Sequence, residues 1–180
     1  MRVSKERAAQ NRARILTAAA RLFRERGLSG VGVDAVTDAA GLTHGSLYSQ
    51  FGSKERLAVE ALGHALSANA AELSDARTLD DFVSRYLSAD HRTRVGEGCA
   101  LTALAGEIPR QGSALRRCFT DAVRGFMTRV TMLEPVARRS EDEALAIVAT
   151  MVGALTLARA VDDPDLSDRI LAAARQRLAP

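Results

Sequence analysis

The chain has 180 residues, of which 47% are hydrophobic, and 25 Lys and Arg against 22 Asp and Glu give it a net charge of +3. This apolar content is enough for a proper core and excludes a disordered protein, and the length corresponds to one large or two small domains. The two cysteines, Cys99 and Cys118, are too few for a disulfide framework and fit a reducing compartment.

The first two helices are expected over residues 5–26 and 33–40. The apolar residues of the first recur at helical spacing and are Ile15, Ala19, Leu22 and Phe23. Gly27 and Gly41 follow the two helices, and glycine readily takes the left-handed conformation that ends a helix. The two segments therefore read as a short helical pair with a tight corner at Gly41.

A third helix is expected after Thr43, which is a good N-cap. Leu47 and Phe51 lie four residues apart and must face inward against the first two helices. The remaining side is predicted to face outward and consists of His44, Gly45, Ser46, Tyr48, Ser49 and Gln50. Such a face fits the DNA major groove, which is about 12 Å wide. The pattern is typical of a DNA-reading helix-turn-helix.

Individual roles follow from side-chain chemistry. We expect Gln50 and His44 to meet base edges, with Gln50 as the first candidate because glutamine pairs bidentately with adenine. Ser46 and Tyr48 are expected to reach phosphates. Gly52 ends the helix, Ser53 caps a fourth, and Lys54 lies at its start, where the helix dipole favours a phosphate. The predicted DNA-binding set is Thr43, His44, Gly45, Ser46, Tyr48, Ser49, Gln50 and Lys54.

Charge is distributed unevenly along the chain. Residues 1–56 hold 10 Lys and Arg against 5 Asp and Glu, whereas the remainder holds 15 against 17. Basic residues at the start of the first helix are therefore candidates for salt-sensitive backbone or minor-groove contacts. They are Arg2, Lys5, Arg7, Arg12 and Arg14. The alternative is that each of these residues, and Tyr48 and Lys54 as well, is an ordinary surface residue of a helical core.

The rest of the chain also reads as helix, with no convincing period-two run that would require a sheet. Further helices are expected over residues 54–73, 79–88, 98–108, 113–133, 141–161 and from Pro164 onward. Pro109 is expected to stop the helix over 98–108. Ser140 and Glu143 form a capping box, and Asp163 caps the last helix. The predicted fold is therefore all-α, with domains over residues 1–52 and 53–180.

At this point the sequence resembles the TetR family of bacterial transcriptional regulators. The residues that carry the resemblance are Gly41, Thr43, Leu47, Tyr48, Phe51 and the Ser53-Lys54-Glu55 run, and the strong match extends from Arg12 to Leu62. Three positions depart from the family pattern: Gly32 replaces a capping Ser or Thr, His44 a Lys, and Gln50 an aromatic or His. The resemblance implies an N-terminal three-helix DNA-binding domain followed by a helical bundle that binds a ligand and dimerises.

The helix over residues 141–161 is apolar around most of its circumference and must be covered on two sides. We expect it and the last helix to pair with their copies about a two-fold axis, as in the TetR dimer. The predicted interface residues are Val148, Val152, Gly153, Leu155, Leu166, Ile170 and Ala174. The alternative is a central buried helix in a monomer.

The middle of the chain would, by the resemblance, form a pocket for a small hydrophobic effector. The predicted pocket residues are Phe82, Tyr86, Cys99, Thr102, Glu107, Phe119, Arg124 and Phe126. In some relatives a cysteine in this region senses electrophiles, but the sequence supplies no clear thiolate activator for Cys99, so a packed core residue is the default. The implied function is a repressor that binds a palindromic operator in double-stranded DNA as a homodimer and is released by its effector.

Other classes of protein fit less well. The three histidines have no metal-ligand spacing, and no nucleophile or phosphate-binding motif occurs, so we expect neither an enzyme nor a cofactor. A helical ligand-binding or adaptor bundle without DNA activity is the alternative. The polar start of the chain differs from a signal peptide, and the apolar run over residues 144–158 is shorter than the roughly 20 residues that span a bilayer. We therefore expect a cytoplasmic protein without a membrane partner.

Overall fold

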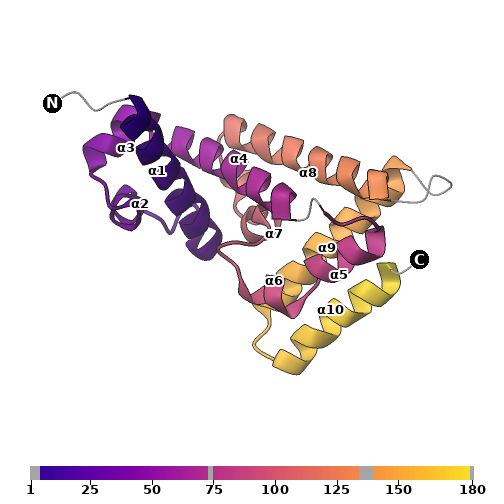
Figure 1. Ribbon diagram of the computed structural model, residues 1–180. Helices are drawn as coiled ribbons and strands as arrows, with labels where there is room; N and C mark the ends of the chain where they lie inside the picture. The colour runs from indigo at the N-terminus through magenta and orange to yellow at the C-terminus, as the bar shows by residue number, and fades with distance from the viewer. Residues whose placement is uncertain (1–4, 73–74, 134–139, 179–180) are drawn as a thin grey trace.

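The computed structural model describes residues 5–72, 75–133 and 140–178, and within these ranges every regular element is a helix (Figure 1). The elements are α1 (Lys5–Arg26), α2 (Val33–Ala40), α3 (His44–Phe51), α4 (Lys54–Glu72), α5 (Leu79–Tyr86), α6 (Ala89–Thr93), α7 (Ala100–Leu104), the 3₁₀ helix η1 (Ile108–Arg110), α8 (Ser113–Leu133), α9 (Glu141–Ala160) and α10 (Pro164–Leu178). Helices α1–α3 form one end of the molecule, and α9 and α10 pack together at the other. The all-α prediction is confirmed.

The predicted helix ends in the first domain are confirmed. Gly27, Gly41 and Gly52 all have positive φ, at 77°, 61° and 76°. The hydroxyl of Thr43 accepts a hydrogen bond from the Ser46 N–H at 3.4 Å and so caps α3. Glycine is required at position 27 for a second reason, because a Cβ there would collide with the Glu107 carboxylate.

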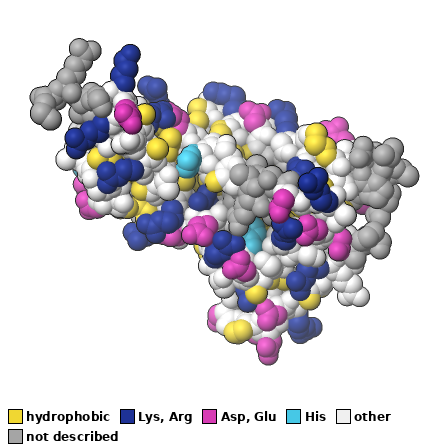
Figure 2. Space-filling model, in the orientation of Figure 1, with side chains coloured by type: hydrophobic (Ala, Val, Ile, Leu, Met, Phe, Trp, Pro, Cys, Tyr) yellow, Lys and Arg dark blue, Asp and Glu magenta, His cyan; other side chains and the backbone are white. Residues whose placement is uncertain are grey.

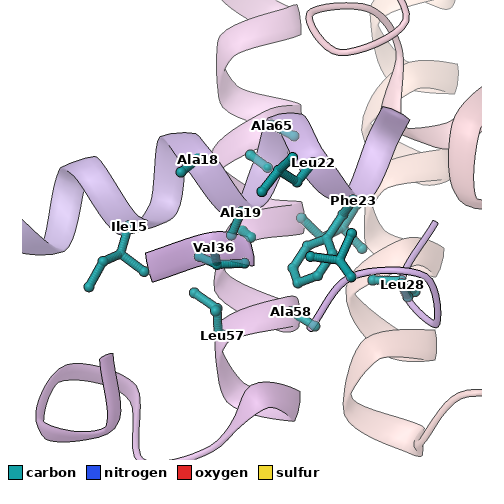
Figure 3. Close-up of a cluster of buried hydrophobic side chains, with 14 of the residues drawn as sticks. Ile15, Ala18, Ala19, Leu22, Phe23, Leu28, Val36, Leu57, Ala58 and Ala65 are labelled. Atoms are coloured by element: carbon teal, nitrogen blue, oxygen red, sulfur yellow. The ribbon is translucent and has the colours of Figure 1, made fainter. Parts of the chain in front are cut away.

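One apolar core joins the first three helices to α4. Ile15, Leu47, Phe51 and Leu57 are completely buried in it, and Figure 3 shows α1 and α4 side chains meeting there. The cluster continues past α4 into α7, η1 and α8 through Ala100, Leu104, Ile108 and Leu115. The predicted domain boundary at residues 52/53 therefore falls between α3 and α4, in the middle of a shared core.

A second core lies among α5, α8, α9 and α10. Its largest fully buried side chains include Tyr86, Phe82, Met151 and Leu155. Ser140 caps the start of α9, and its hydroxyl accepts from the Glu143 N–H at 3.0 Å. Because α4 carries residues of the first core and also borders the second through Leu66, it connects the two ends of the molecule.

The middle of the chain differs from the sequence prediction. The segment 98–108 is not one helix: α7 ends at Leu104, and Pro109 lies inside η1 instead of stopping a helix. Proline lacks an N–H and suits a first helical turn. The helix expected over residues 79–88 ends at Tyr86. Ser88 then caps a further helix, α6, which the sequence did not predict. The predicted end of α4 at Leu73 lies outside the described residues.

A carboxylate explains why the helix breaks after Leu104. The turn places Glu107 against the end of α1, where its two oxygens accept hydrogen bonds from the N–H groups of Leu28 and Ser29, both at 3.1 Å. Leu28 and Ser29 lie after the end of α1, so their N–H groups are outside the helix. Glu107 therefore fastens the turn after α7 to the end of α1.

We predict that Glu107→Ala lowers the free energy of unfolding by about 1–3 kcal/mol, because the partly buried Leu28 N–H and the exposed Ser29 N–H lose their charged acceptor. Glu107→Gln should lie between this variant and the native chain, since an amide offers one acceptor oxygen and turns a donor toward the other N–H. The measurement is urea unfolding at fixed protein concentration. Glu97→Ala, which removes an exposed pair with Arg94, is the control. Equal stability of the Ala variant and the native chain would contradict the assigned role.

Candidate functional site

The predicted reading face is the outer side of α3. A three-residue turn joins it to α2, closed by hydrogen bonds from Gly41 N to Asp38 O at 3.0 Å and from Leu42 N to Thr37 O at 2.9 Å. Leu47 and Phe51 are buried beneath α3, whereas Tyr48 is 49% exposed. Thr43, His44, Gly45 and Ser49 are also exposed. The helix therefore presents a polar surface on a rigid apolar base.

Two members of the predicted set do not face fully outward. Ser46 is half-buried, with its hydroxyl 3.2 Å from that of Thr43. Gln50 is half-buried as well, because its side-chain amide donates to the Ala8 carbonyl oxygen of α1 at 3.2 Å. Both residues were expected to face outward, and both are only partly exposed. His44 is exposed and its ring pairs with Asp34 of α2.

Arg12 holds α3 in place from below. Its guanidinium lies over the Phe51 ring, 4.7 Å from the centroid, and pairs with the Glu60 carboxylate of α4. This arginine was predicted as a DNA contact, but in the structure it joins α1, α3 and α4. Arg2 lies outside the described residues, so its predicted contact has no structural counterpart here.

The start of α4 lies beside the reading face. The Ser53 hydroxyl accepts from the Arg56 N–H at 3.2 Å, which confirms the predicted cap, and Lys54 is the first helical residue. The pKa of Glu55 is lowered because its backbone N–H and then Ser53 hydrogen-bond its carboxylate. Residues 1–56 hold 10 Lys and Arg against 5 Asp and Glu, and Figure 2 shows several basic side chains on the end formed by α1–α3, with others over the rest of that face. This surface is suited to an anionic partner.

A cavity of about 790 Å³ lies in the second domain, bordered by α4, α5, α6, α7 and α8. Phe82, Tyr86, Cys99 and Phe126 line it, as the sequence predicts. The three aromatic rings form one cluster, with centroids 5.6 Å apart for Phe82–Phe126 and 5.4 Å apart for Tyr86–Phe126. The volume and the aromatic wall suit a ligand of drug-like size.

The other predicted pocket residues lie elsewhere. Glu107 caps the loop after α1, and Arg124 is exposed and pairs with Asp121 at 3.3 Å. Phe119 packs between the two cores without lining the cavity, and Thr102 lies behind the wall. These four residues do not line the cavity, which corrects their assignment. Helical spacing predicts which side of a helix a residue lies on, but not which other element packs against that side.

The buried wall behind the cavity is polar. The Tyr86 and Thr102 hydroxyl oxygens are 2.9 Å apart, and burial is the first cause that raises the pKa of Tyr86 well above its ordinary value. His91 accepts from the Cys99 N–H through Nε2 at 2.9 Å, so its Nδ1 donates to the Tyr86 carbonyl oxygen at 2.7 Å. Arg159 of α9 donates to the His91 carbonyl oxygen at 2.6 Å. The wall thus ties α5, α6, α7 and α9 together.

Sequence reasoning missed the charged lining of the cavity, which consists of Arg85, Asp90, His91, Arg94 and Arg129. These residues look like solvated helix positions in the sequence, and only the tertiary arrangement brings them together. Cys99 is buried, and its N–H is held by His91. Within the described ranges, no group of three or more His, Cys, Asp or Glu side chains could hold a metal ion.

An apolar face of α9 and α10 is left uncovered in the single chain. Leu145, Leu157 and Leu166 are 47%, 58% and 40% exposed, and Val152, Gly153 and Ile170 are partly exposed beside them. The predicted interface residues Val148, Leu155 and Ala174 are buried in the chain's own core, so they lie behind this face and not on it. Leu145 and Leu157 were missed by the sequence reasoning.

Helix α9 is longer than the apolar run noted in the sequence. With 20 residues it is long and apolar enough to cross a membrane by length and composition alone. In the structure it packs against α7, α8 and α10, and Ile147, Met151 and Leu155 are buried. A core helix of a folded protein meets the same length criterion.

Comparisons with known proteins agree with this geometry. Residues 15–61 match the family model described as bacterial regulatory proteins, tetR family. The HTH-type transcriptional regulator LmrA of Bacillus subtilis is 30% identical over 121 residues, which are 62% of this chain and 64% of that protein's length. The chain thus spans somewhat less than two thirds of this curated relative.

Solved structures establish the fold over nearly the whole chain. The reduced form of E. coli NemR has a TM-score of 0.77 at 20% identity and covers 93% of this chain and 94% of its own. A TetR-family regulator from Cytophaga hutchinsonii also has a TM-score of 0.77, at 23% identity, with 99% and 96% covered. A TetR regulator from Chloroflexus aurantiacus has a TM-score of 0.72 at 24% identity, with 96% and 94% covered.

We predict that Tyr86→Phe lowers the free energy of unfolding by about 1–2 kcal/mol, because the buried Thr102 hydroxyl loses its partner. Tyr48→Phe is a matched control, since it removes a hydroxyl from an exposed ring and should change stability by less than about 0.5 kcal/mol. Urea unfolding of both variants at one protein concentration makes the comparison. Equal effects of the two substitutions would show that the Tyr86–Thr102 pair does not stabilise the cavity wall.

Proposed function

Because the chain belongs to the TetR family of bacterial regulatory proteins by its N-terminal domain and its fold, we propose that it is a DNA-binding transcriptional repressor. In this role it binds a palindromic operator as a homodimer in the cytoplasm and is released by a small effector. The observation that carries the proposal is the exposed polar face of α3, supported by buried Leu47 and Phe51 at the basic end of the molecule. Members of this family are regulators, and we assign no catalytic activity to the chain.

Contacts with DNA divide into positioning and reading roles. Tyr48 is exposed on α3 and Lys54 begins α4, which supports contacts from both residues to phosphates on the rim of the major groove. Gln50 is anchored to the Ala8 carbonyl and would have to exchange that hydrogen bond for a base edge. His44 would likewise leave Asp34. Base reading by these two residues therefore involves a rearrangement of side chains on binding.

The uncovered face of α9 and α10 supports a homodimer. A surface of a soluble protein that exposes several leucines together is generally a site of contact with a partner. Two copies of this face about a two-fold axis would form a four-helix bundle. The dimer would carry two α3 helices, and reading successive major grooves requires them to lie about 34 Å apart.

Release by an effector is proposed to act through α4. This helix contributes Leu57 and Ala61 to the core that it shares with α1, and its other end contributes Leu66 to the cavity. A ligand that favours one tilt of α4 would change the separation of the two α3 helices. Because both half-sites must be met together, a change in this separation weakens operator binding.

The alternative is a helical ligand-binding or adaptor bundle without DNA activity, and binding to sheared genomic DNA separates the two. For the regulator, we predict binding whose affinity falls steeply with salt concentration. Tyr48→Ala and Lys54→Ala should weaken binding to all sequences alike, whereas Gln50→Ala should also relax sequence preference. Fluorescence anisotropy over a salt series is the measurement, with Met132→Ala at the distant end of α8 as the control. Unchanged binding in all three variants would remove the proposed site.

We predict that Leu157→Glu converts the dimer to a monomer, because it places a charge on the uncovered apolar face. Met132→Glu is the matched control, since Met132 is also exposed, at 63%, but lies at the end of α8. Sedimentation velocity gives the oligomeric state, and circular dichroism checks the helical content. A native chain that is monomeric at micromolar concentration, or a Leu157→Glu variant that remains dimeric, would contradict this interface.

A further inference from the structure

The cavity combines an aromatic wall with three arginines that neighbouring groups hold in ion pairs and hydrogen bonds. Its charged lining consists of three arginines, Arg85, Arg94 and Arg129, and a single carboxylate, Asp90. Arg94 and Asp90 are paired with each other at 2.6 Å on one side, next to α6. Arg85 and Arg129 approach from α5 and α8.

Two of these arginines converge on one point of the chain. Arg85 donates to the Asp75 carboxylate at 2.7 Å, and Arg129 donates to the carbonyl oxygen of the next residue, Ala76, at 2.8 Å. Their guanidinium groups are therefore held at the same side of the cavity by adjacent residues. Asp75 is exposed and pairs with Arg85, so a carboxylate already occupies a position beside this arginine at the solvent side.

The aromatic wall shares α5 and α8 with these arginines. Phe82, Tyr86 and Phe126 form the aromatic cluster described above, and Leu66, Leu101 and Ala122 extend it. A ligand that satisfies both the rings and the arginines has an apolar body and an anionic head, because guanidinium forms strong charge-assisted hydrogen bonds with carboxylates. A cationic head would meet the arginine pair and lose affinity.

We propose that the cavity binds amphipathic organic acids, with the carboxylate held by Arg85 and Arg129 and the apolar body lying against Phe82, Tyr86 and Phe126. The role of this ligand as an effector rests on the proposed regulator function. Binding to the cavity does not depend on that function. The ligand carboxylate takes the place of Asp75 at Arg85, and Asp81, which also accepts from Arg85 at 2.7 Å, keeps the side chain oriented. Asp75 thus competes with the ligand.

The test uses three probes with the same alkyl chain and different heads: decanoate, decanol and decylammonium. Isothermal titration calorimetry on the full-length protein without DNA should rank decanoate first, at least about tenfold tighter than decylammonium, because one charge-assisted hydrogen bond is worth that factor or more. Decanoate that fails to bind in the millimolar range, or decylammonium or decanol that binds as tightly, would overturn the proposal.

Variants separate the arginine pair from the general charge of the protein. Arg85→Met and Arg129→Met should each weaken decanoate about tenfold and leave decanol unchanged. Arg124→Met makes the same substitution on α8 outside this cavity and should change neither affinity. Asp75→Asn should tighten decanoate, since it removes the competing carboxylate. Thermal unfolding confirms that each variant is folded, and equal decanoate affinity across the native chain and the two cavity arginine variants would overturn the assignment.

Failure of the ligand class and failure of the regulator function have different signatures. A protein that binds sheared DNA with steep salt dependence but does not prefer decanoate keeps the proposed function and loses this inference. A protein that prefers decanoate in the native chain and loses that preference in Arg129→Met, yet binds no DNA, keeps the inference and loses the proposed function. The DNA assay and the calorimetry are independent measurements on one preparation.

Discussion

Helices α1 and α4 share a close-packed apolar interface that spans the whole of the first core. Ile15 and Ala19 of α1 and Leu57 and Ala61 of α4 are all completely buried in it. Because a close-packed interior has few voids, a shift of one helix in it also shifts the helices packed against it. The reading helix α3 rests on this interface through Phe51 and Arg12, so its orientation follows the orientation of α4.

Two polar contacts link α1 and the loop after it to the segment over residues 96–107, part of which lines the cavity. Glu107 caps the loop after α1, and Arg24 donates to the Gly96 carbonyl oxygen at 2.7 Å. The same segment carries Cys99, whose N–H is held by His91 at the cavity wall. A ligand against this wall is therefore separated from the end of α1 by short, hydrogen-bonded connections. In this arrangement the cavity borders α4, which packs against α3, and the segment containing α7, which is attached to α1.

Helix ends, inward faces and the reading helix could be derived from the sequence because they depend on local signals. The glycines at 27, 41 and 52, the Thr43 cap and the spacing of Leu47 and Phe51 act within a few residues. The polar contacts between distant segments could not be derived in this way. Glu107 looked like a pocket residue and Arg12 like a DNA contact, because a charged side chain at a helix surface gives no sign of its partner in the sequence.

The cavity shows the same division. Phe82, Tyr86, Cys99 and Phe126, which the resemblance assigns to an effector pocket, line this cavity, whereas its arginines come from α5, α8 and the end of α6 and meet only in the fold. The apolar face of α9 was inferred from its composition. Its exposed residues, Leu145 and Leu157, could be distinguished from the buried Val148 and Leu155 only when the packing of α8 and α10 was known.

The central claim is that two symmetric α3 faces read DNA together. Selection of bound fragments from genomic DNA by the native protein, followed by sequencing, tests it most directly. We expect the enriched fragments to share an inverted repeat whose half-site centres are about one helical turn, or a small multiple of it, apart. Enrichment of a single unrepeated site, or no enrichment over input DNA, would contradict the account.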